Sequence, residues 1–314
     1  MKNSYLKKNW FAVAFCMCCC FFVFDTKAQQ QTLQSFYFFN PLVFNPAYAG
    51  SQGALTVTGN IRDQWTSFKG APKTECLSIH SPLKNENIGL GAVLINDELG
   101  ATKTTSAYGD FAYSIRLNKK NHRLVFGLQG GIDCYRTNFS NLTIIDNTDN
   151  VYLNGFNYSK TLFNVGAGIY YYGERFYLGA SCPGFLNNKL NISAGQTAVQ
   201  ENHYYVFGGV VLKLNSVVNM RPSFMIKYVQ NAPLSVDANL SFLFYDKIWL
   251  GAMYRYNSFV GANIMFNVRP NFRIGYAYDY SISIASSIAG GSHEIMLSYS
   301  FKTMSKGFKT PRYF

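Results

Sequence analysis

The 314-residue sequence carries a formal net charge of +12, yet only 14% of its residues are charged, whereas 17% are aromatic. Ordinary soluble domains contain about 25% charged residues, so the composition argues against a typical soluble domain. The basic residues form no dense stripe, and we expect no nucleic-acid partner. Beyond the N-terminal region no apolar run reaches the ~18 residues of a membrane helix. Together these features favour a membrane β-barrel.

The N-terminus has the features of a secretory signal peptide. Three lysines within the first eight residues precede an almost wholly apolar run at residues 10–24. Small residues follow at the positions that a signal peptidase reads, so we predict that residues 1–28 are removed after Ala28. A membrane anchor is the alternative, but the run is short for one and a polar stretch follows it. We predict a location in the outer membrane of a Gram-negative bacterium.

Residues 29–53 precede the first predicted strand and contain the stretch FNPLVFNPAYAGS at residues 39–51. Each of its two Asn-Pro steps lacks a backbone donor and disfavours helix at the preceding residue. Such a backbone cannot lie unpaired in lipid. We therefore predict a periplasmic or plug-like lead-in that folds into the lumen or packs on the periplasmic rim. The alternative is a structural lead-in that only covers the first strand.

From residue 54 onward, apolar and polar side chains alternate, as they do in a strand with one apolar face. In ALTVTGNIRDQW, for example, Leu55, Val57 and Ile61 share one face, and Asp63 is the exception on it. About fourteen such segments occur, most of them long enough to cross a bilayer when tilted. They are residues 54–68, 73–82, 87–97, 104–117, 122–136, 160–172, 174–182, 203–214, 220–230, 234–245, 247–257, 258–268, 271–283 and 291–302.

The links between these predicted strands are sorted by length. Links after even-numbered strands, such as PLKNEN and NKKN, are short and polar, whereas the long links at residues 137–159, 183–202 and 284–290 follow odd-numbered strands. Outer-membrane barrels have an even number of strands, short periplasmic turns and long extracellular loops. We therefore predict an all-β fold, a transmembrane antiparallel β-barrel of about fourteen strands at residues 54–302, and a basic periplasmic tail at residues 303–314.

The polar faces of the predicted strands carry charges of both signs, which favours a lumen braced by ion pairs over a pore selective for one sign. The charged residues assigned to the lumen are Arg62, Asp110, Arg116, Arg123, Asp133, Arg175, Lys227, Asp237, Arg255, Arg273, Asp279 and Glu294. The histidines and the three cysteines beyond the signal peptide lack metal-ligand spacing, so we expect no metal and no cofactor. His80 with Ser78 or Ser81 is a weak candidate for a lipid-face hydrolase, because no third partner is placed. We expect no catalytic residues.

The stretches FNPLVFNPAYAGS, RDQWTSFKGAPKTECLSIHSPL and NIGLGAVLINDELG follow one another between residues 39 and 100. In this order they resemble the PorP/SprF family of outer-membrane proteins of the Bacteroidota type IX secretion system. Residues 120–314 agree in length and in their aromatic hairpins but carry no sharp motif. The motif residues that we expect to bind a partner or support the structure are Asn40, Pro41, Asn45, Pro46, Ala47, Tyr48, Gly50, Arg62, Gln64, Trp65, Gly70, Ala71 and Pro72.

The resemblance implies a monomeric, non-enzymatic barrel in a hetero-complex, which supports secretion and cell-surface anchoring of cargo through protein–protein binding. The implied partners are outer-membrane lipid, secreted cargo with a type IX C-terminal domain, gliding adhesins among them, and periplasmic secretion, motor or peptidoglycan-binding components. The links at residues 137–159 and 183–202, rich in Asn, Tyr and Ser, are candidate cargo contacts. The alternative is a passive porin or solute transporter, since a barrel of about fourteen strands can enclose a channel.

Overall fold

The computed structural model describes residues 34–67, 69–117, 122–138, 157–193, 196–282 and 290–301 of the chain. The predicted signal peptide and tail, most of the link predicted at residues 137–159 and nearly all of that at 284–290 lie outside these residues. Within the described residues, no helix is long and apolar enough to cross a membrane.

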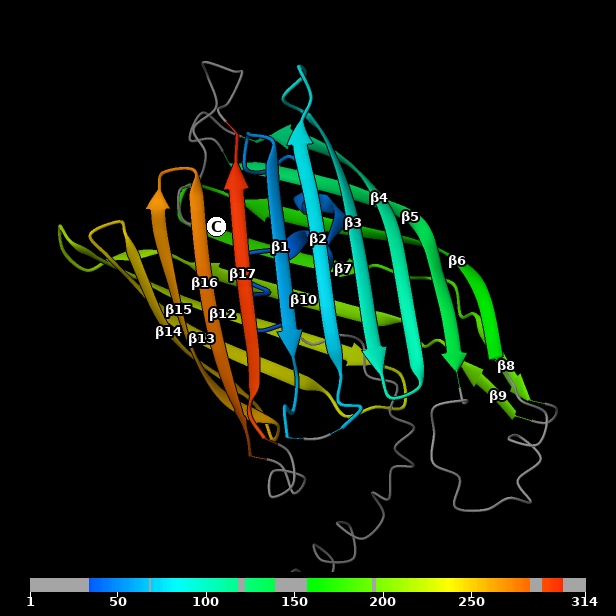
Figure 1. Cartoon of the computed structure of the whole chain (residues 1–314). Helices are drawn as coiled ribbons and strands as arrows, with labels where there is room; N and C mark the ends of the chain where they lie inside the picture. Colours follow the sequence, from blue (N-terminus) through cyan, green and yellow to red (C-terminus); the bar gives the residue numbers. More distant parts are fainter. Residues whose placement is uncertain are drawn as a thin grey trace, which may run out of the picture.

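Fourteen antiparallel strands close into a barrel, as the sequence predicts (Figure 1). They are β1 (Thr56–Asp63), β2 (Lys73–Pro82), β3 (Ile88–Leu99), β4 (Thr102–Arg116), β5 (Arg123–Asn138), β6 (Asn157–Tyr172), β7 (Phe176–Cys182), β10 (His203–Val210), β12 (Val218–Val229), β13 (Ser235–Phe244), β14 (Ile248–Arg255), β15 (Phe259–Arg269), β16 (Phe272–Ser281) and β17 (Ser292–Ser300). Each strand pairs with the next one, and β1 pairs with β17 to close the barrel. The short β11 (Leu212–Lys213) continues β10 alongside β12.

The links are sorted between the two ends of the barrel as predicted. Residues 64–72, 139–156, 183–202 and 282–291 all connect strands at one end, which we call the long-link end. The arrowheads of β1, β3 and β5 point to it in Figure 1. At the opposite, short-turn end, the connections are tight, as at residues 83–87.

One hairpin inside the link at residues 183–202 is absent from the sequence prediction. It consists of β8 (Lys189–Ser193) and β9 (Gln196–Val199), which pair only with each other in the described chain. Strands of five and four residues are too short to show a clear alternation, which explains the omission. The link is tied to the barrel wall, because Phe185 N donates to Val165 O (2.8 Å) and Gln200 Nε2 donates to Asp133 Oδ2 (3.1 Å).

The alternation of side chains sorts polar residues into the lumen and apolar residues onto the outer face. In β1 the buried residues are Thr56, Thr58, Asn60 and Arg62, whereas Ile61 is 50% exposed on the outside. An apolar outer band is what the hydrocarbon core of a bilayer requires. Asp63, the predicted exception, is indeed exposed at the last position of the strand.

The barrel wall is taller on one side. β4, β5 and β6 have 15, 16 and 16 residues, and β14 has only 8. A tilted strand needs about 9–11 residues to cross the hydrocarbon core. Polar side chains occupy the outward face at the long-link end of the tall strands, with Asn96, Thr105 and Arg136 as examples. The wall of β3–β6 therefore extends past the bilayer at the long-link end.

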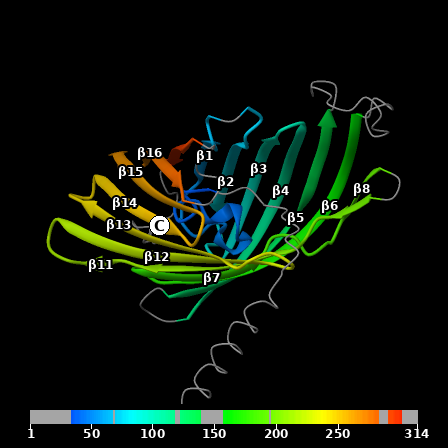
Figure 2. The same cartoon turned by 90° about the horizontal axis from the view of Figure 1, so that it is seen from below.

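The lumen is occupied by the chain that precedes β1. Residues 34–54, which we call the luminal plug, include two short 3-10 helices, η1 (Pro41–Val43) and η2 (Pro46–Tyr48). Figure 2 shows this segment in blue within the ring of strands. All of its residues are buried, and its aromatic side chains form one core with inward-facing residues of the wall. The first described residue, Gln34, lies in the half of the lumen nearer the long links, among residues of β12, β13 and β14.

Candidate functional site

The two Asn-Pro steps each start a 3-10 turn in the luminal plug. Asn40 and Asn45 have extended φ angles of −133° and −142°, as expected for residues before proline. Proline then occupies the first helical position, where its missing N–H leaves no bond unmade. The Asn45 side chain accepts a hydrogen bond from Ala47 N (2.9 Å) and so caps η2. Local sequence alone therefore explains the turns.

Polar bonds to the wall fix the plug at its middle. Asn45 also donates through Nδ2 to the carbonyl of Ile169 on β6 (3.0 Å). Ser181 on β7 donates to the carbonyl of Phe44 (2.6 Å). A turn-rich backbone leaves carbonyls and amides without ladder partners, and burial without such partners is costly. The wall thus supplies the hydrogen bonds that the 3-10 turns cannot make themselves.

Three inward-facing glycines, on β3, β5 and β6, make room for the plug. A Cβ at Gly127 would lie 2.1 Å from Ala47 N, and one at Gly89 would lie 2.1 Å from Ala49 O. A Cβ at Gly168 would lie 2.0 Å from Asn45 Oδ1. Real Cβ atoms do not approach other atoms so closely, so a side chain is excluded at Gly89 and Gly127, which face plug backbone, whereas one at Gly168 would displace the Asn45 side chain. We call Gly89, Gly127 and Gly168 the glycine sockets.

A buried ionic cluster holds the start of the plug. Arg62 Nη1 lies 2.6 Å from Asp279 Oδ2 and 3.3 Å from Glu294 Oε2. Ser35 joins both carboxylates, because its N–H donates to Glu294 (2.6 Å) and its hydroxyl to Asp279 (2.5 Å). Asn60 Nδ2 adds a bond to Glu294 Oε1 (3.1 Å). Buried charges need partners of this kind, and the cluster ties the plug to β1, β16 and β17.

Ser78 and His80, the pair considered for a lipid-face hydrolase, face the lumen and bind the plug. Ser78 donates to Asn40 Oδ1 (2.9 Å), and His80 Nδ1 accepts from Gly50 N (3.1 Å). The ring of Tyr48 packs edge-on against His80 at 5.3 Å between centroids. Burial raises the pKa of the Tyr48 phenol, so it stays neutral at physiological pH. A hydrolase at the lipid face is therefore not built from Ser78 and His80.

An arginine lies among aromatic rings where the plug meets β12 and β14. The guanidinium carbon of Arg221 is 4.0 Å from the ring centroid of Phe39 and 4.4 Å from that of Trp249. Phe39 and Trp249 themselves meet edge to face at 5.5 Å. A desolvated cation over aromatic faces gains about 2 kcal/mol or more, so this cluster clamps the aromatic half of the plug to the wall.

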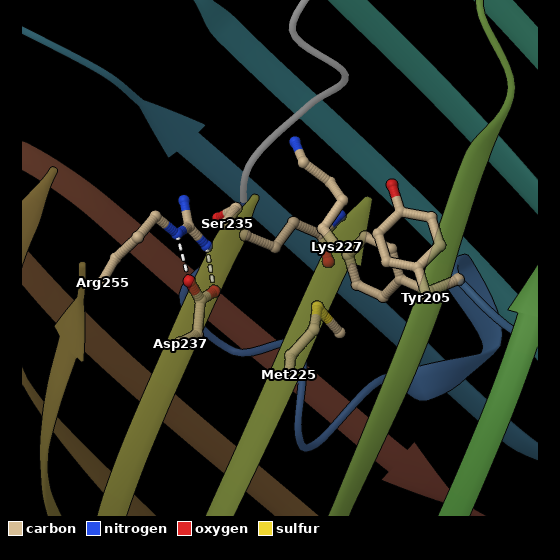
Figure 3. A pocket seen from close by; sticks show the side chains of 8 residues that line it. Tyr205, Met225, Lys227, Ser235, Asp237 and Arg255 are labelled. Atoms are coloured by element: carbon tan, nitrogen blue, oxygen red, sulfur yellow. Dashed lines mark hydrogen bonds and ion pairs between the residues drawn. The ribbon is translucent and has the colours of Figure 1, made fainter. Parts of the chain in front are cut away.

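The space left beside the plug is small. Figure 3 shows side chains from β10, β12, β13 and β14 converging there, with the Asp237–Arg255 ion pair on one side and Lys227 and Tyr205 on the other. The pocket holds about 10 Å³, which is the room of roughly one water molecule. A second pocket between the plug residue Val43 and the link at residues 183–202 holds about 40 Å³. Neither is wide enough to let a solute pass.

Five of the predicted motif residues lie outside the plug, in the link between β1 and β2 at the long-link end. Gln64 N donates to Pro72 O (2.9 Å), which closes the link on itself. Trp65 and Gly70 have positive φ angles of 52° and 82°, and a bulky residue in that region is strained. Gly70 O accepts from Gly100 N of the next link (2.9 Å). We call residues 64–72 the rim link.

The predicted motif residues therefore fall into two groups. Asn40, Pro41, Asn45, Pro46, Ala47, Tyr48 and Gly50 belong to the plug, and Arg62 binds its first residues. Gln64, Trp65, Gly70, Ala71 and Pro72 form the rim link. The sequence analysis did not predict the glycine sockets or the Arg221 cluster. For the glycines a signal was present, because each stands at an inward-facing position of its strand, where a side chain would otherwise be expected. Among the described residues no group of side chains fits a metal ion, and all three described cysteines are free.

Solved outer-membrane proteins have a similar fold. The CymD monoaromatic hydrocarbon channel matches with a TM-score of 0.50 and 11% identity, over 83% of this chain and 92% of that chain. Omp33 of Acinetobacter baumannii matches at 0.44 and 8% identity, over 80% and 100% of the two chains. The Pseudomonas putida toluene transporter TodX matches at 0.46 and 12% identity, over 88% and 95%. At these identities the likeness concerns the fold alone.

No curated protein matches the sequence. In contrast, the sequence model of the family described as type IX secretion system membrane protein PorP/SprF matches residues 26–299. The match spans the luminal plug, the rim link and nearly the whole barrel, including both groups of motif residues. Together with the barrel fold it identifies an outer-membrane component of type IX secretion. The chain belongs to the PorP/SprF family of type IX secretion system membrane proteins.

Proposed function

We propose that this barrel acts as a protein-binding platform, which supports secretion and cell-surface anchoring of cargo with a type IX C-terminal domain, gliding adhesins among them. The observation that carries the proposal is the luminal plug. Its buried residues lie inside the lumen, and the two pockets beside them in the described part of the chain hold about 10 and 40 Å³. A barrel filled in this way is suited to binding proteins rather than to passing solutes. We also propose a non-enzymatic role, which the membership in a family of secretion-system membrane proteins supports.

The plug residues support the platform instead of contacting partners directly. Asn40, Asn45, Ala47 and Tyr48 are at most 2% exposed, so a partner protein cannot reach them. Their hydrogen bonds join the plug to β6 and to β2. We propose that these residues keep the cross-sectional shape of the barrel fixed and thereby fix the position of its rim.

The partner contacts are proposed for the two ends of the barrel. At the long-link end, which outer-membrane barrels direct to the cell exterior, the rim link and the link at residues 183–202 both include exposed residues. These are the proposed cargo contacts. At the short-turn end, the proposed partners are periplasmic secretion, motor or peptidoglycan-binding components. The barrel itself is proposed to be monomeric within this hetero-complex.

The test is an affinity pull-down of the tagged barrel from detergent-solubilised outer membranes, with mass spectrometry as the readout. We expect a large secreted protein with a type IX C-terminal domain, together with periplasmic components. The variant Trp65→Ala in the rim link should lose the cargo but keep the periplasmic components. Tyr256→Ala is the matched control, because Tyr256 is an exposed aromatic residue (60%) in another link of the same end. Recovery of the barrel alone, after crosslinking as well, would contradict the proposal.

The second candidate function is a passive porin or solute transporter. The fold favours it only in general terms, since fourteen strands can enclose a channel if nothing fills it. Planar-bilayer recordings separate the two functions. A large steady current from the purified full-length protein supports the porin, whereas near-silent bilayers support the platform.

A further inference from the structure

The larger of the two pockets beside the plug lies under the link at residues 183–202. It holds about 40 Å³, which is room for a few water molecules. Part of its lining is apolar, and its polar side chains are those of Tyr108, Gln129, Asn164, Gln200, Glu201 and His203. Gln200 and Glu201 belong to the link and are partly exposed, so this side of the pocket borders the medium at the long-link end. We call this cavity the acceptor pocket.

Three of these polar side chains are already engaged by the protein. The hydroxyl of Tyr108 donates to Asp133 Oδ1 (2.6 Å), and Gln200 Nε2 donates to Asp133 Oδ2 (3.1 Å). The side-chain oxygen of Asn164 accepts from Leu186 N of the link (3.1 Å). These bonds close the link over the pocket and leave Gln129, Glu201 and His203 to be accounted for.

The remaining three side chains offer acceptors that no donor reaches. Gln129 Oε1 is buried and has no hydrogen-bond partner among the described residues. His203 Nδ1 lies 3.0 Å from the carbonyl oxygen of Glu201, which can only accept, so Nδ1 carries the hydrogen and Nε2 of the neutral ring is an acceptor. This Nε2 is buried and likewise lacks a partner in the described part of the chain. The carboxylate of Glu201 takes part in none of the ion pairs between described residues.

Negative charge gathers at the acceptor pocket without a cation to balance it. Glu201 supplies one carboxylate, and the buried Asp133 beside the pocket supplies a second. The donors to Asp133 are neutral, with Ser106 Oγ (2.5 Å) as the third of them. Lys227, a cation on β12, lines the other pocket instead. Because a desolvated carboxylate needs a partner, the pocket favours a ligand that brings both a positive charge and hydrogen-bond donors.

A primary ammonium group has these properties, since it carries one positive charge and three donors. Its donors match Gln129 Oε1, His203 Nε2 and the carboxylate of Glu201. The apolar part of the lining, Val43 and Val93 among it, suits the carbon next to the nitrogen. We propose that the acceptor pocket binds the ammonium group of a primary amine, which is either the end of a lysine side chain from a partner protein or a small free amine. The site goes beyond the proposed platform role, and only the choice of a cargo protein as the source of the lysine rests on that role.

A titration of the purified full-length barrel in detergent with isotope-labelled methylammonium chloride tests the pocket, with NMR line broadening as the readout. We expect saturable binding that sodium and calcium ions at the same ionic strength do not displace. Glu201→Gln should weaken this binding about tenfold, because a neutral acceptor replaces a charged one. Glu174→Gln is the matched control, since Glu174 is an exposed carboxylate in a turn of the short-turn end. Equal binding by the two variants, or displacement by calcium, would overturn the proposal.

The two neutral acceptors have variants of their own. Gln129→Met removes Oε1 at a similar side-chain volume, and His203→Phe removes Nε2 but keeps a ring to stack on Tyr205. Each should weaken methylammonium binding several-fold, because a buried donor of the ligand loses its acceptor. The heat-modified migration of each variant in gels verifies folding. Wild-type affinity in both folded variants would show that the ammonium group does not lie in this pocket.

The pull-down of the tagged barrel decides the source of the amine. If Glu201→Gln loses a cargo protein that the wild type and Glu174→Gln recover, the ligand is a lysine side chain of that cargo. If Glu201→Gln keeps all cargo but loses methylammonium, the ligand is a small free amine. A wild-type barrel that recovers no cargo contradicts the platform function alone, because the methylammonium titration still decides whether the pocket binds an ammonium group.

Discussion

The backbone nitrogen of Ala47 occupies the space that a side chain at residue 127 would need, since a Cβ on Gly127 would lie 2.1 Å from it. The plug and the barrel wall are therefore in backbone contact, with no side chain between them. This contact places η2 directly against β5, so the plug is an integral part of the packed barrel interior.

Gly127→Val should push the plug away from β5. Overpacking of a filled interior costs about 1–3 kcal/mol, and we expect the free energy of unfolding in urea to fall by this amount. Limited proteolysis should then cut within residues 34–54, which the wild-type barrel protects. Gly130→Val, three positions along the same strand but outward-facing with open space, is the control. Equal urea midpoints for the two variants would show that the socket is not needed.

Arg62→Met should destabilise the barrel strongly. It leaves the carboxylates of Asp279 and Glu294 buried without their cation, and breaking a buried pair costs about 3–5 kcal/mol. Urea denaturation monitored by tryptophan fluorescence measures the loss. Adding Glu294→Gln to Arg62→Met should recover part of it, because one uncompensated charge is gone. Lys247→Met, at an exposed turn residue, should change stability by less than about 1 kcal/mol. An Arg62→Met variant as stable as wild type would contradict the ionic role.

Asn45→Ala should loosen the centre of the plug. The substitution removes the cap of η2 and the bond to Ile169 O, and loss of a cap alone costs about 0.5–2 kcal/mol. Hydrogen exchange should show faster exchange at residues 44–50, with the strands far from the plug unchanged. Asn187→Ala, at an exposed asparagine of a link, should leave exchange in the plug as it is. Unchanged protection at Ala47 in the Asn45→Ala variant would argue against this role.

A combined Pro41→Ala and Pro46→Ala variant should release the proposed partners. The prolines pre-set the backbone of both turns, so their loss should free the plug and, through Ser35 and Arg62, disturb the rim. Co-purification of cargo and periplasmic components is the measurement. Unchanged recovery of all partners from a folded variant would limit the Asn-Pro segment to a structural role.

A variant that lacks residues 34–53 should conduct ions. Among the described residues, the two pockets beside the plug hold about 10 and 40 Å³, whereas an empty barrel of about fourteen strands encloses an aqueous channel. Single-channel recordings in planar bilayers should therefore show a clear rise in conductance over the wild-type protein. If the wild-type protein already conducts as strongly as the variant, the plug does not close the barrel and the porin alternative gains support.

The strands and the ends of the barrel were predictable from the sequence because their signals are local. Alternation from Thr56 to Asp63 defines β1 without reference to any other strand, and the contrast between the short and long links indicates which ends lie together. The hairpin β8–β9 was not predictable, because its strands are too short to alternate visibly. The Asn-Pro turns were read correctly as breaks in regular structure, since proline acts on its own residue and the one before it.

The sequence by itself thus determined the membrane barrel, its fourteen strands and the family, all of which depend on patterns within short stretches. Only the tertiary structure decided that Ser35 meets Asp279 and Glu294, 244 and 259 positions away, and that Gly127 lies against Ala47. These contacts arise when the sheet closes and brings β1, β16 and β17 around the plug. No local pattern encodes them, because the register of the closed barrel sets which residues share the lumen.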